Sequence, residues 1–475
     1  MPLFNGCKTA VKVRERLTDM ELDMTKGSPS KLIIKFVIPL IIGNVFQQFY
    51  AMVDTIIVGR FVGVQALAAV GATGTISFLI IGFMQGITMG FTVITAQRFG
   101  AGDVEGLKKS VGNAIFLSVI TTAVMTFVSI RCMDGLLGIM NTPADIFGMS
   151  KTYIVIICAG MGCTVLYNLF ASFLRAVGNS KAPLYFLVIS AGLNIVLDLL
   201  LILVIPMGVA GAAVATILSQ GISGLLCLIY IMKRVPVLQI KKEHLKPEYC
   251  CCMNQIGIGI PMALQFSITA VGAMLVQSAL NMFGSTVIAA YTAACKVEQF
   301  MTQPFCAMGM TMATYCAQNR GINAMDRIRK GVRIANIMSA VYAVLIFGVL
   351  LLTFPFMIGL FVSGDITEVL GYAETYMRIC GCFFIPLGMI FIFRNAMQGC
   401  GYSFLPMLGG VVELVCRATV AFAAAYYQSY VGVCLGNASA WLMTGIFLLI
   451  AYQFVMRNVM KHIRDSEERR QNSVV

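Results

Sequence analysis

The sequence predicts an all-α polytopic membrane protein whose twelve transmembrane helices form two pseudo-symmetric six-helix lobes of the same orientation. Three observations predict this fold: the apolar composition, the long uncharged runs and an internal repeat. Of the 475 residues, 59% are hydrophobic and 12% are charged, and the mean hydropathy is +0.86. A soluble protein of this length needs more charge to cover its surface. The same figures exclude a disordered chain, a coiled coil, collagen and a disulfide scaffold.

The uncharged runs favour helices over barrel strands. Residues 111–130 and 153–174 contain no charge and are long enough to cross a hydrocarbon core about 30 Å thick as helices. The ten-residue segments of alternating polarity that are typical of a membrane barrel do not occur in the sequence. The pattern predicts spans at residues 33–58, 66–97, 109–130, 149–174, 182–204, 208–232, 254–282, 286–318, 333–357, 369–393, 404–427 and 431–457.

Basic residues lie mainly in the tails and the even-numbered loops, which places both termini in the cytosol by the positive-inside rule. Loops on the opposite side are short, or acidic as at Asp365 and Glu368. This distribution explains the net charge of +13 without a nucleic-acid partner. The basic residues of the predicted cytosolic side include Lys31, Lys35, Arg98, Lys108, Lys109, Arg175, Lys181, Lys233, Arg234, Lys241, Lys242, Lys246, Arg320, Arg327, Arg329, Lys330, Arg333, Lys461 and Arg464.

Polar segments divide the chain into predicted parts. Residues 1–30 lack the apolar core of a signal peptide, so we expect a cytosolic tail. The lysine-rich segment 235–253 is predicted to link a first lobe at 31–234 to a second lobe at 254–457, followed by a cytosolic tail at 458–475. The sixteen cysteines are predicted to be reduced thiols in apolar surroundings. Because His244 and His462 both lie in polar segments, we expect no cofactor and no histidine-ligated metal in the membrane.

The two halves of the chain resemble each other. Residues 96–100 match 317–321, a shift of 221 positions, and Lys108-Lys109 meets Arg329-Lys330 at the same shift. Residues Gly178, Ser180 and Pro183 match Gly401, Ser403 and Pro406 at a shift of 223 positions. The nearly constant shift argues against chance similarity between helices of similar composition. Six spans in each half give the halves the same orientation, and such a parallel repeat suits a transporter that rocks one bundle against the other.

Asp54 is the first polar group that needs an explanation, because a charge at the bilayer centre costs at least about 2.5–3.5 kcal/mol. It is the only charge between Phe36 and Gly59, and Gln47 and Tyr50 extend a polar stripe along the same helix. A functional role is the favoured interpretation; the alternative is an acid solvated near the outer end of its span. Pro39 removes a backbone hydrogen bond and is the predicted bend point of this helix.

Asn194 and Asp198 are four residues apart on the fifth predicted span, so their side chains share one face. Two oxygen-bearing groups at this spacing can share a cation or a proton, since an amide supports either protonation state of a nearby acid. The alternative is an acid that local hydrogen bonds keep neutral.

Two further charged pairs occur in the second half. Lys296 and Glu298 lie in the eighth predicted span, where an ion pair and a substrate role are equally compatible with the sequence. Glu413 and Arg417 have the spacing of a structural ion pair on one helix.

The repeat separates structural from functional acids. Shifting Asp54 by 221 to 223 positions reaches Leu275, Val276 or Gln277, and the same shift of Asp198 reaches Thr419, Val420 or Ala421. The acids of the first half therefore have no counterparts in the second. Residues that build the shared scaffold should recur in both halves, so an unduplicated acid indicates a function performed once.

These residues resemble the MATE (multidrug and toxic compound extrusion) family, and within it the DinF-like bacterial branch. The resemblance covers roughly residues 25–457. It rests on Tyr50-x3-Asp54-Thr55-Ile56-x-Val58-Gly59-Arg60, Gly63, Ala66-Leu67-Ala68-Ala69-Val70-Gly71, Ala96-Gln97 with Gly100, Gly178-Asn179-Ser180, and Asn194-x3-Asp198 followed by Gly208-x2-Gly211-Ala212-Ala213.

The resemblance implies a cation- or proton-coupling site, with Na⁺ as the only expected metal, and a substrate cavity. Asp54, Asn194, Asp198 and Thr216 would form the coupling site. The seventh span lacks the acid that the NorM-like branch carries there, which argues against a second coupling site in that lobe. The expected cavity residues are Gln47, Tyr50, Tyr153, Asn168, Gln265 and Glu298.

The sequence therefore predicts a non-enzymatic antiporter of a bacterial plasma membrane. It would act as a monomer in the lipid bilayer and export organic, mainly cationic, drug-like compounds in exchange for H⁺ or Na⁺. One alternative is a flippase for lipid-linked precursors, whose basic cavity would need Lys296, Arg394 and Arg417. A channel or membrane enzyme ranks last, because no ligand constellation, nucleophile with a base or nucleotide loop occurs in the sequence.

Overall fold

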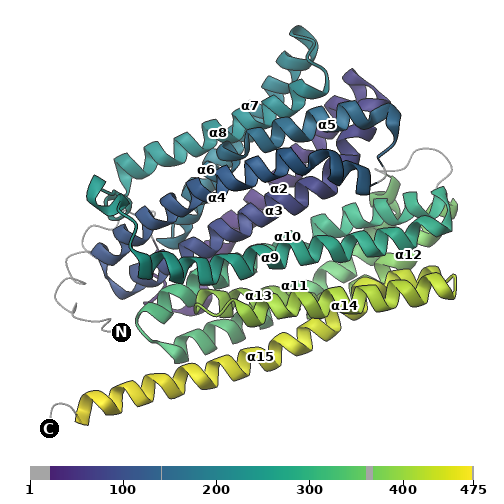
Figure 1. The fold of residues 1–475 in the computed structure, drawn as a ribbon. Helices are drawn as coiled ribbons and strands as arrows, with labels where there is room; N and C mark the ends of the chain where they lie inside the picture. The colour runs from purple at the N-terminus through teal and green to yellow at the C-terminus, as the bar shows by residue number, and fades with distance from the viewer. Residues whose placement is uncertain (1–21, 141, 360–366, 473–475) are drawn as a thin grey trace. The chain divides into compact units, whose positions relative to one another are not determined.

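The protein is helical throughout the part of the chain that the computed structural model describes (Figure 1). The described residues are 22–140, 142–359 and 367–472, and they contain no strand. Most of the predicted N-terminal tail, and Asp365 in the predicted outer loop, lie outside them.

Helices occupy all twelve predicted span positions, and the predicted all-α membrane fold is confirmed. Nine described helices are long and apolar enough to cross a membrane, or eleven when each of two bent pairs counts as one span. Helix α10, at the eighth position, has 37 residues but is less apolar because it carries Lys296 and Glu298. In chain order the helices are α2 (Pro29–Ile57), α3 (Val64–Ala101), α4 (Val104–Ile139), α5 (Ala144–Ala159), α6 (Met161–Ala176), α7 (Lys181–Leu199), α8 (Val209–Arg234), α9 (Tyr249–Leu280), α10 (Ser285–Gly321), α11 (Met325–Gly359), α12 (Thr367–Cys382), α13 (Phe384–Gly399), α14 (Phe404–Tyr426) and α15 (Tyr430–Asn472).

The fourth span of each half is a bent pair of helices, where the sequence predicts one continuous span. Helices α5 and α6 meet at 47°, and α12 and α13 meet at 51°. The first break falls at Gly160, where a Cβ atom would lie 2.3 Å from the side chain of Ile217 on α8. The same break at the same position of both halves supports the repeat.

The chain divides into two compact units. Of the described residues, unit 1 contains 22–24 and those within Lys35–Ser267, and unit 2 contains Thr25–Ile34 and those from Ile268 onward. The division falls within α2 and α9. The first helix of each predicted lobe therefore begins in one unit and continues in the other.

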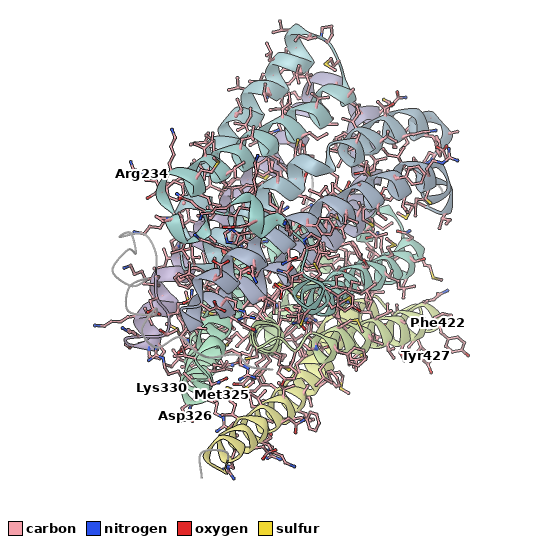
Figure 2. All side chains as sticks on the ribbon, turned by 60° about the vertical axis from the view of Figure 1, so that its left-hand side comes forward. Arg234, Met325, Asp326, Lys330, Phe422 and Tyr427 are labelled. Atoms are coloured by element: carbon pink, nitrogen blue, oxygen red, sulfur yellow. The ribbon has the colours of Figure 1, made fainter. Side chains whose placement is uncertain are left out.

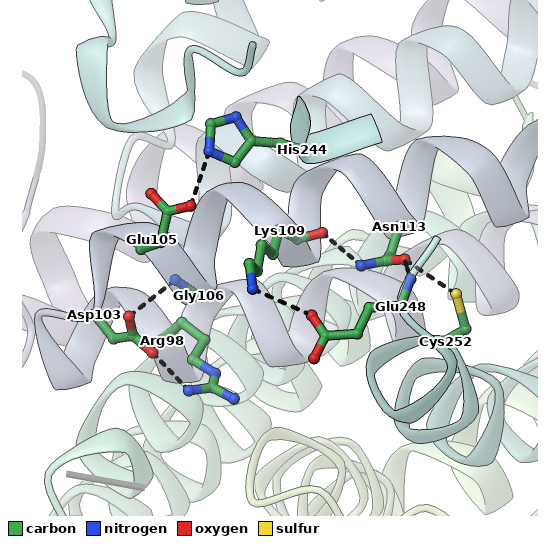
Figure 3. A network of polar contacts seen from close by, with 9 residues as sticks. All are labelled: Arg98, Asp103, Glu105, Gly106, Lys109, Asn113, His244, Glu248 and Cys252. Atoms are coloured by element: carbon green, nitrogen blue, oxygen red, sulfur yellow. Dashed lines mark hydrogen bonds and ion pairs between the residues drawn. The ribbon is translucent and has the colours of Figure 1, made fainter. Parts of the chain in front are cut away.

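The segment after α8 is folded onto unit 1. It forms two 3₁₀ turns, Pro236–Leu238 and Lys242–Leu245, which contact α4. The buried ring of His244 accepts a hydrogen bond at Nδ1 from the backbone N–H of Lys241, at 2.9 Å. Since Nδ1 accepts, a neutral ring carries its proton on Nε2 and donates it to Glu105, at 3.1 Å (Figure 3).

Amide side chains fix the start of α9 to α3 and α4. The Oδ1 atom of Asn113 accepts from the backbone N–H of Glu248 at 2.8 Å and from Sγ of Cys252 at 3.1 Å (Figure 3). One turn farther along α9, Nε2 of Gln255 donates to the carbonyl oxygens of Phe91 and Ser110, at 3.2 and 2.8 Å. These bonds satisfy an orphan N–H at the helix start and keep the first half of α9 within unit 1.

Glycines allow α3 and α9 to pack backbone to backbone in unit 1. A Cβ atom at Gly90 would lie 2.4 Å from Cα of Gly259, and one at Gly86 would lie 2.7 Å from the carbonyl oxygen of Met262. Neither contact can be relieved by rotating a side chain.

We expect Gly90→Ala to destabilise the protein by about 1–3 kcal/mol, because the added methyl group must push two backbones apart. The control is Gly74→Ala on the same helix, where a Cβ atom meets nothing within 4 Å. That change should be neutral or slightly stabilising, since alanine favours helices over glycine by about 0.5–1 kcal/mol. Thermal unfolding of both variants in detergent tests this prediction, which equal midpoints would contradict.

The two ends of unit 2 differ in chemistry. Asp326 and Lys330 lie where α11 begins, whereas Phe422 and Tyr427 project at the opposite end of the unit, from α14 and the residue after it (Figure 2). Both aromatic side chains are exposed. Charged residues beyond the ends of the spans and tyrosines at the membrane–water interface are typical of a membrane-spanning unit.

Candidate functional site

Asp54 and Asp198 come together in unit 1, although they are far apart in the chain. Asp54 lies on α2 and is 9% exposed, and Asp198 lies on α7 and is 0% exposed. Their carboxyl groups are near enough to interact electrostatically. The structure therefore pairs the two acids that the sequence predicts on different helices.

The acid pair lacks hydrogen-bond donors. Oδ1 of Asp54 and both carboxyl oxygens of Asp198 are buried without a partner. Asn194, one turn earlier on α7, is 1% exposed, and its Oδ1 and Nδ2 atoms also have no partner. Ionised carboxylates only accept hydrogen bonds, so a proton on one acid or a cation between them is needed to satisfy this group.

Both helices that carry the acids change geometry just beyond them. Helix α2 continues as a π-helix at Val58–Val62, and α7 continues as a π-helix at Leu200–Val204. The two π segments are in contact. A backbone hydrogen bond that spans five residues closes each π segment. The N–H of Gly63 donates to the carbonyl oxygen of Val58, and the N–H of Ile205 donates to that of Leu200. Such segments are rare and are frequent at functional sites.

Two tyrosines interact with the acids, and a glutamine contacts one of these tyrosines. Tyr50 lies one turn before Asp54 on α2, and it interacts electrostatically with both acids. Tyr153 on α5 is 9% exposed and interacts with the same two acids and with Tyr50. The side chain of Gln220 on α8 hydrogen bonds to Tyr50. The sequence predicts both tyrosines but not Gln220, whose only signal is its place one turn after Thr216 in an apolar helix.

Four other predicted site residues lie on α2, α6, α8 and α9. Gln47 is exposed on α2, and Thr216 is half-buried on α8. Asn168 on α6 donates from Nδ2 to the carbonyl oxygen of Thr164 of its own helix, at 3.0 Å. Gln265 is buried on α9. For these four residues a place in the cavity or the coupling site stays a prediction, as does a bend at Pro39, which lies inside α2.

Glu298 belongs to unit 2, where its partner is a tyrosine. Its carboxylate accepts a hydrogen bond from the hydroxyl group of Tyr376 on α12, which also contacts Asn437 on α15 at 3.0 Å. Among the described residues no ion pair joins Glu298 to Lys296, and Lys296 is exposed. The ion-pair interpretation of these two residues is wrong, because residues two apart on a helix point in different directions.

The predicted pair of Glu413 and Arg417 is confirmed, and a third residue joins it. Oε1 of Glu413 lies 2.8 Å from Nη2 of Arg417, and Oε2 lies 3.3 Å from Nη2 of Arg394 on α13. All three side chains are at most 7% exposed. One carboxylate thus holds two buried guanidinium groups within unit 2.

The acid pair is suited to binding a cation rather than to covalent chemistry. In the described ranges no group of three or more His, Cys, Asp or Glu side chains has the geometry of a metal site. A site for Na⁺ would therefore use amide and hydroxyl oxygens as well as the two carboxylates.

The comparisons with known proteins agree with this fold. The model of the MatE family matches residues 39–200 and 261–423, which together exceed half of the chain. The two matched segments begin at positions 39 and 261, a shift of 222 that falls between the repeat shifts of 221 and 223.

Curated relatives match along most of their length. The chain is 28% identical to the "Probable multidrug resistance protein YoeA" of Bacillus subtilis, over 89% of this chain and 93% of that protein. It is 26% identical to the "Probable multidrug resistance protein NorM" of Thermotoga maritima, over 87% and 88% of the two chains. Among solved structures, an outward-facing multidrug resistance MATE family transporter of the MOP superfamily has a TM-score of 0.86 at 22% identity, covering 94% of this chain and all of the other. That likeness concerns the fold.

Proposed function

Because this chain belongs to the MatE family, whose relatives are multidrug efflux transporters, we propose that it is a secondary active antiporter. It exports organic, mainly cationic, drug-like compounds in exchange for H⁺ or Na⁺, by alternating access of two rocking bundles. The proposal includes a multi-pass location in a bacterial plasma membrane with both termini in the cytosol, and a monomer as the transporting species.

One observation carries the proposal: the buried acid pair of Asp54 and Asp198 has three oxygens without a donor, beside an equally unpartnered Asn194. Leaving a buried polar group unpaired costs about 1–3 kcal/mol, and more when it is charged. A bound cation removes this penalty, and its release restores it. Coupling then requires that the ion bind one conformation of the transporter more tightly than the other.

The driving force depends on the net charge that moves. One positive charge that moves inward against export of a neutral compound gains about 2.3 kcal/mol per 100 mV, equivalent to roughly a fifty-fold concentration ratio. Exchange of one ion for one monovalent organic cation moves no net charge, so export of that cation is driven by the concentration gradient of H⁺ or Na⁺. A cation that enters from outside would occupy the acid pair and bias the first lobe, and the substrate would leave outward before the loaded transporter resets.

Reconstituted vesicles test this function directly. A pH gradient and a Na⁺ gradient are imposed separately, and the efflux of an organic cation dye is followed by its fluorescence. We expect at least one gradient to drive dye transport against its concentration, with protein-free vesicles as the control. Dye movement that responds to neither gradient would refute antiport.

The alternative, a flippase for lipid-linked precursors, is less well supported. It needs a basic cavity for a pyrophosphate group, but the two candidate guanidinium groups, those of Arg394 and Arg417, are bonded to Glu413. The remaining candidate, Lys296, is exposed on α10.

A further inference from the structure

Helix α10 of unit 2 has a polar face within its membrane-spanning part. Four polar side chains follow one another at spacings of four, three and four residues, which places them on one face of the helix. They are Thr292, Lys296, Gln299 and Gln303. Gln303 is the central residue of the 37 in α10, so this polar face reaches the middle of the helix. The side chains of Thr292, Lys296 and Gln299 are exposed.

The opposite face of this part of α10 is buried and apolar. Ala290, Ala294 and Val297 are all 0% exposed. A helix that faces lipid exposes apolar side chains instead, as α11 does with Val344 and Leu345, which are 61% and 63% exposed. Charged side chains within a span face a water-filled cavity or a partner in the protein. The polar face of α10 is therefore suited to line a water-filled path and not to contact hydrocarbon.

Lys296 is a free cation on this face. Wherever the structure describes the chain, its ammonium group has neither an ion pair nor a hydrogen bond. Glu298 does not neutralise it, because a residue two positions later points away, and its carboxylate accepts from the hydroxyl group of Tyr376. The hydroxyl group of Thr292 and the side-chain amide of Gln299, one turn to either side of Lys296, have no partner in the same part of the chain.

We propose that Thr292, Lys296 and Gln299 form a binding site for a carboxylate group of the transported compound. The ammonium group supplies the charge, and the flanking hydroxyl and amide groups donate further hydrogen bonds to the two oxygens. Lys296 is the only basic residue of α10 before Arg320, so the site balances one negative charge and favours a carboxylate over a phosphate of charge about −2. This assignment rests on the proposed function and narrows it to compounds that carry a carboxylate beside their cationic group.

Two dyes test the site. One is a rhodamine with a free carboxylate, and the other is the ethyl ester of the same dye, which keeps the cationic ring system and lacks the negative charge. Their dissociation constants are measured by fluorescence anisotropy with purified protein in detergent, and their efflux is followed in reconstituted vesicles. In Lys296→Gln we expect the dissociation constant of the carboxylate dye to rise at least tenfold, which corresponds to about 1.4 kcal/mol, while that of the ester changes by less than about twofold. Lys296→Arg keeps the charge and should retain the preference for the carboxylate dye.

The matched control is Lys330→Gln, which removes one exposed ammonium group of unit 2 where α11 begins, away from the polar face of α10 (Figure 2). It should change neither dissociation constant. Lys296→Gln should fold like wild type, because the ammonium group has no partner to lose. If this variant cannot be recovered folded, Gln299→Leu carries the test and should weaken binding of the carboxylate dye alone.

Four results would overturn the assignment: an unchanged affinity of Lys296→Gln for the carboxylate dye, an equal loss for both dyes, an equal loss in Lys330→Gln, or a wild type that binds the ester and not the carboxylate dye. The anisotropy measurement does not depend on transport. A wild type that binds the carboxylate dye through Lys296 but moves neither dye refutes antiport and still supports the site.

Discussion

Asp198→Asn is expected to abolish gradient-driven dye efflux while the protein still folds. Asp198 is fully buried, and both its carboxyl oxygens lack a donor. An amide of the same shape neither binds a proton nor carries the charge that attracts a cation, so the ion no longer favours one state of the transporter. Coupling free energies of about 1–3 kcal/mol correspond to a 5- to 150-fold loss, which would bring the rate to that of empty vesicles.

The matched control is Asp134→Asn, an acid on α4 that is exposed and pairs with Lys151 at 2.7 Å. This change should leave efflux within about twofold of wild type, since exposed ion pairs contribute at most about 1 kcal/mol. Asp54→Asn should reproduce the loss seen in Asp198→Asn, because the two acids face each other. Full activity of both buried variants, with an unfolding midpoint like that of wild type, would remove the coupling site from this pair.

Glu413→Gln should destabilise the protein by about 3–5 kcal/mol, the cost of breaking a buried ion pair from one side. Glu413 holds the guanidinium groups of Arg394 and Arg417, and the variant leaves two positive charges buried together without a counterion. Equilibrium unfolding in detergent measures the loss. The expected result includes recovery when Glu413, Arg394 and Arg417 are all replaced by leucine, because a well-packed apolar cluster needs no counterion.

An exposed Glu–Arg pair on α12 serves as the control for the Glu413→Gln measurement. Glu374 and Arg378 have the same i,i+4 spacing and lie 2.5 Å apart, but their side chains are 42% and 64% exposed. Glu374→Gln should change the free energy of unfolding by less than about 1 kcal/mol, since solvent screens an exposed pair. Equal effects of the two substitutions would show that burial of the Glu413 cluster has no energetic consequence.

The residues of the acid site could be predicted from the sequence because they form pairs that are close together in the chain. Asn194 and Asp198 share a helix face at a spacing of four, and Tyr50 and Asp54 do the same on another helix. The resemblance to the MATE family then placed both pairs in one predicted site. Gln220 stayed hidden, because one polar residue in an apolar helix does not reveal which side chain on a distant helix it will meet.

The second half shows the same limit. Glu413 and Arg417 could be paired from their spacing, whereas Arg394 lies 19 positions away and on another helix. Glu298 bonds to Tyr376, 78 positions along the chain, and not to the nearby Lys296. Spacing along one helix predicts neighbours on that helix, and it carries no information about which helices pack together.

The sequence by itself determined the number and order of the spans and the repeat, and it predicts which side their loops face. Those properties follow from how each segment partitions between water and hydrocarbon, which depends on local composition and charge. Tertiary structure alone decided the meeting of Asp54 with Asp198 and of Tyr50 with Gln220, the bends at Gly160 and Phe383 and the π turns after both acids. These features depend on the packing of helices that are remote in the chain, where burial makes each unpaired polar atom costly enough to select its partner.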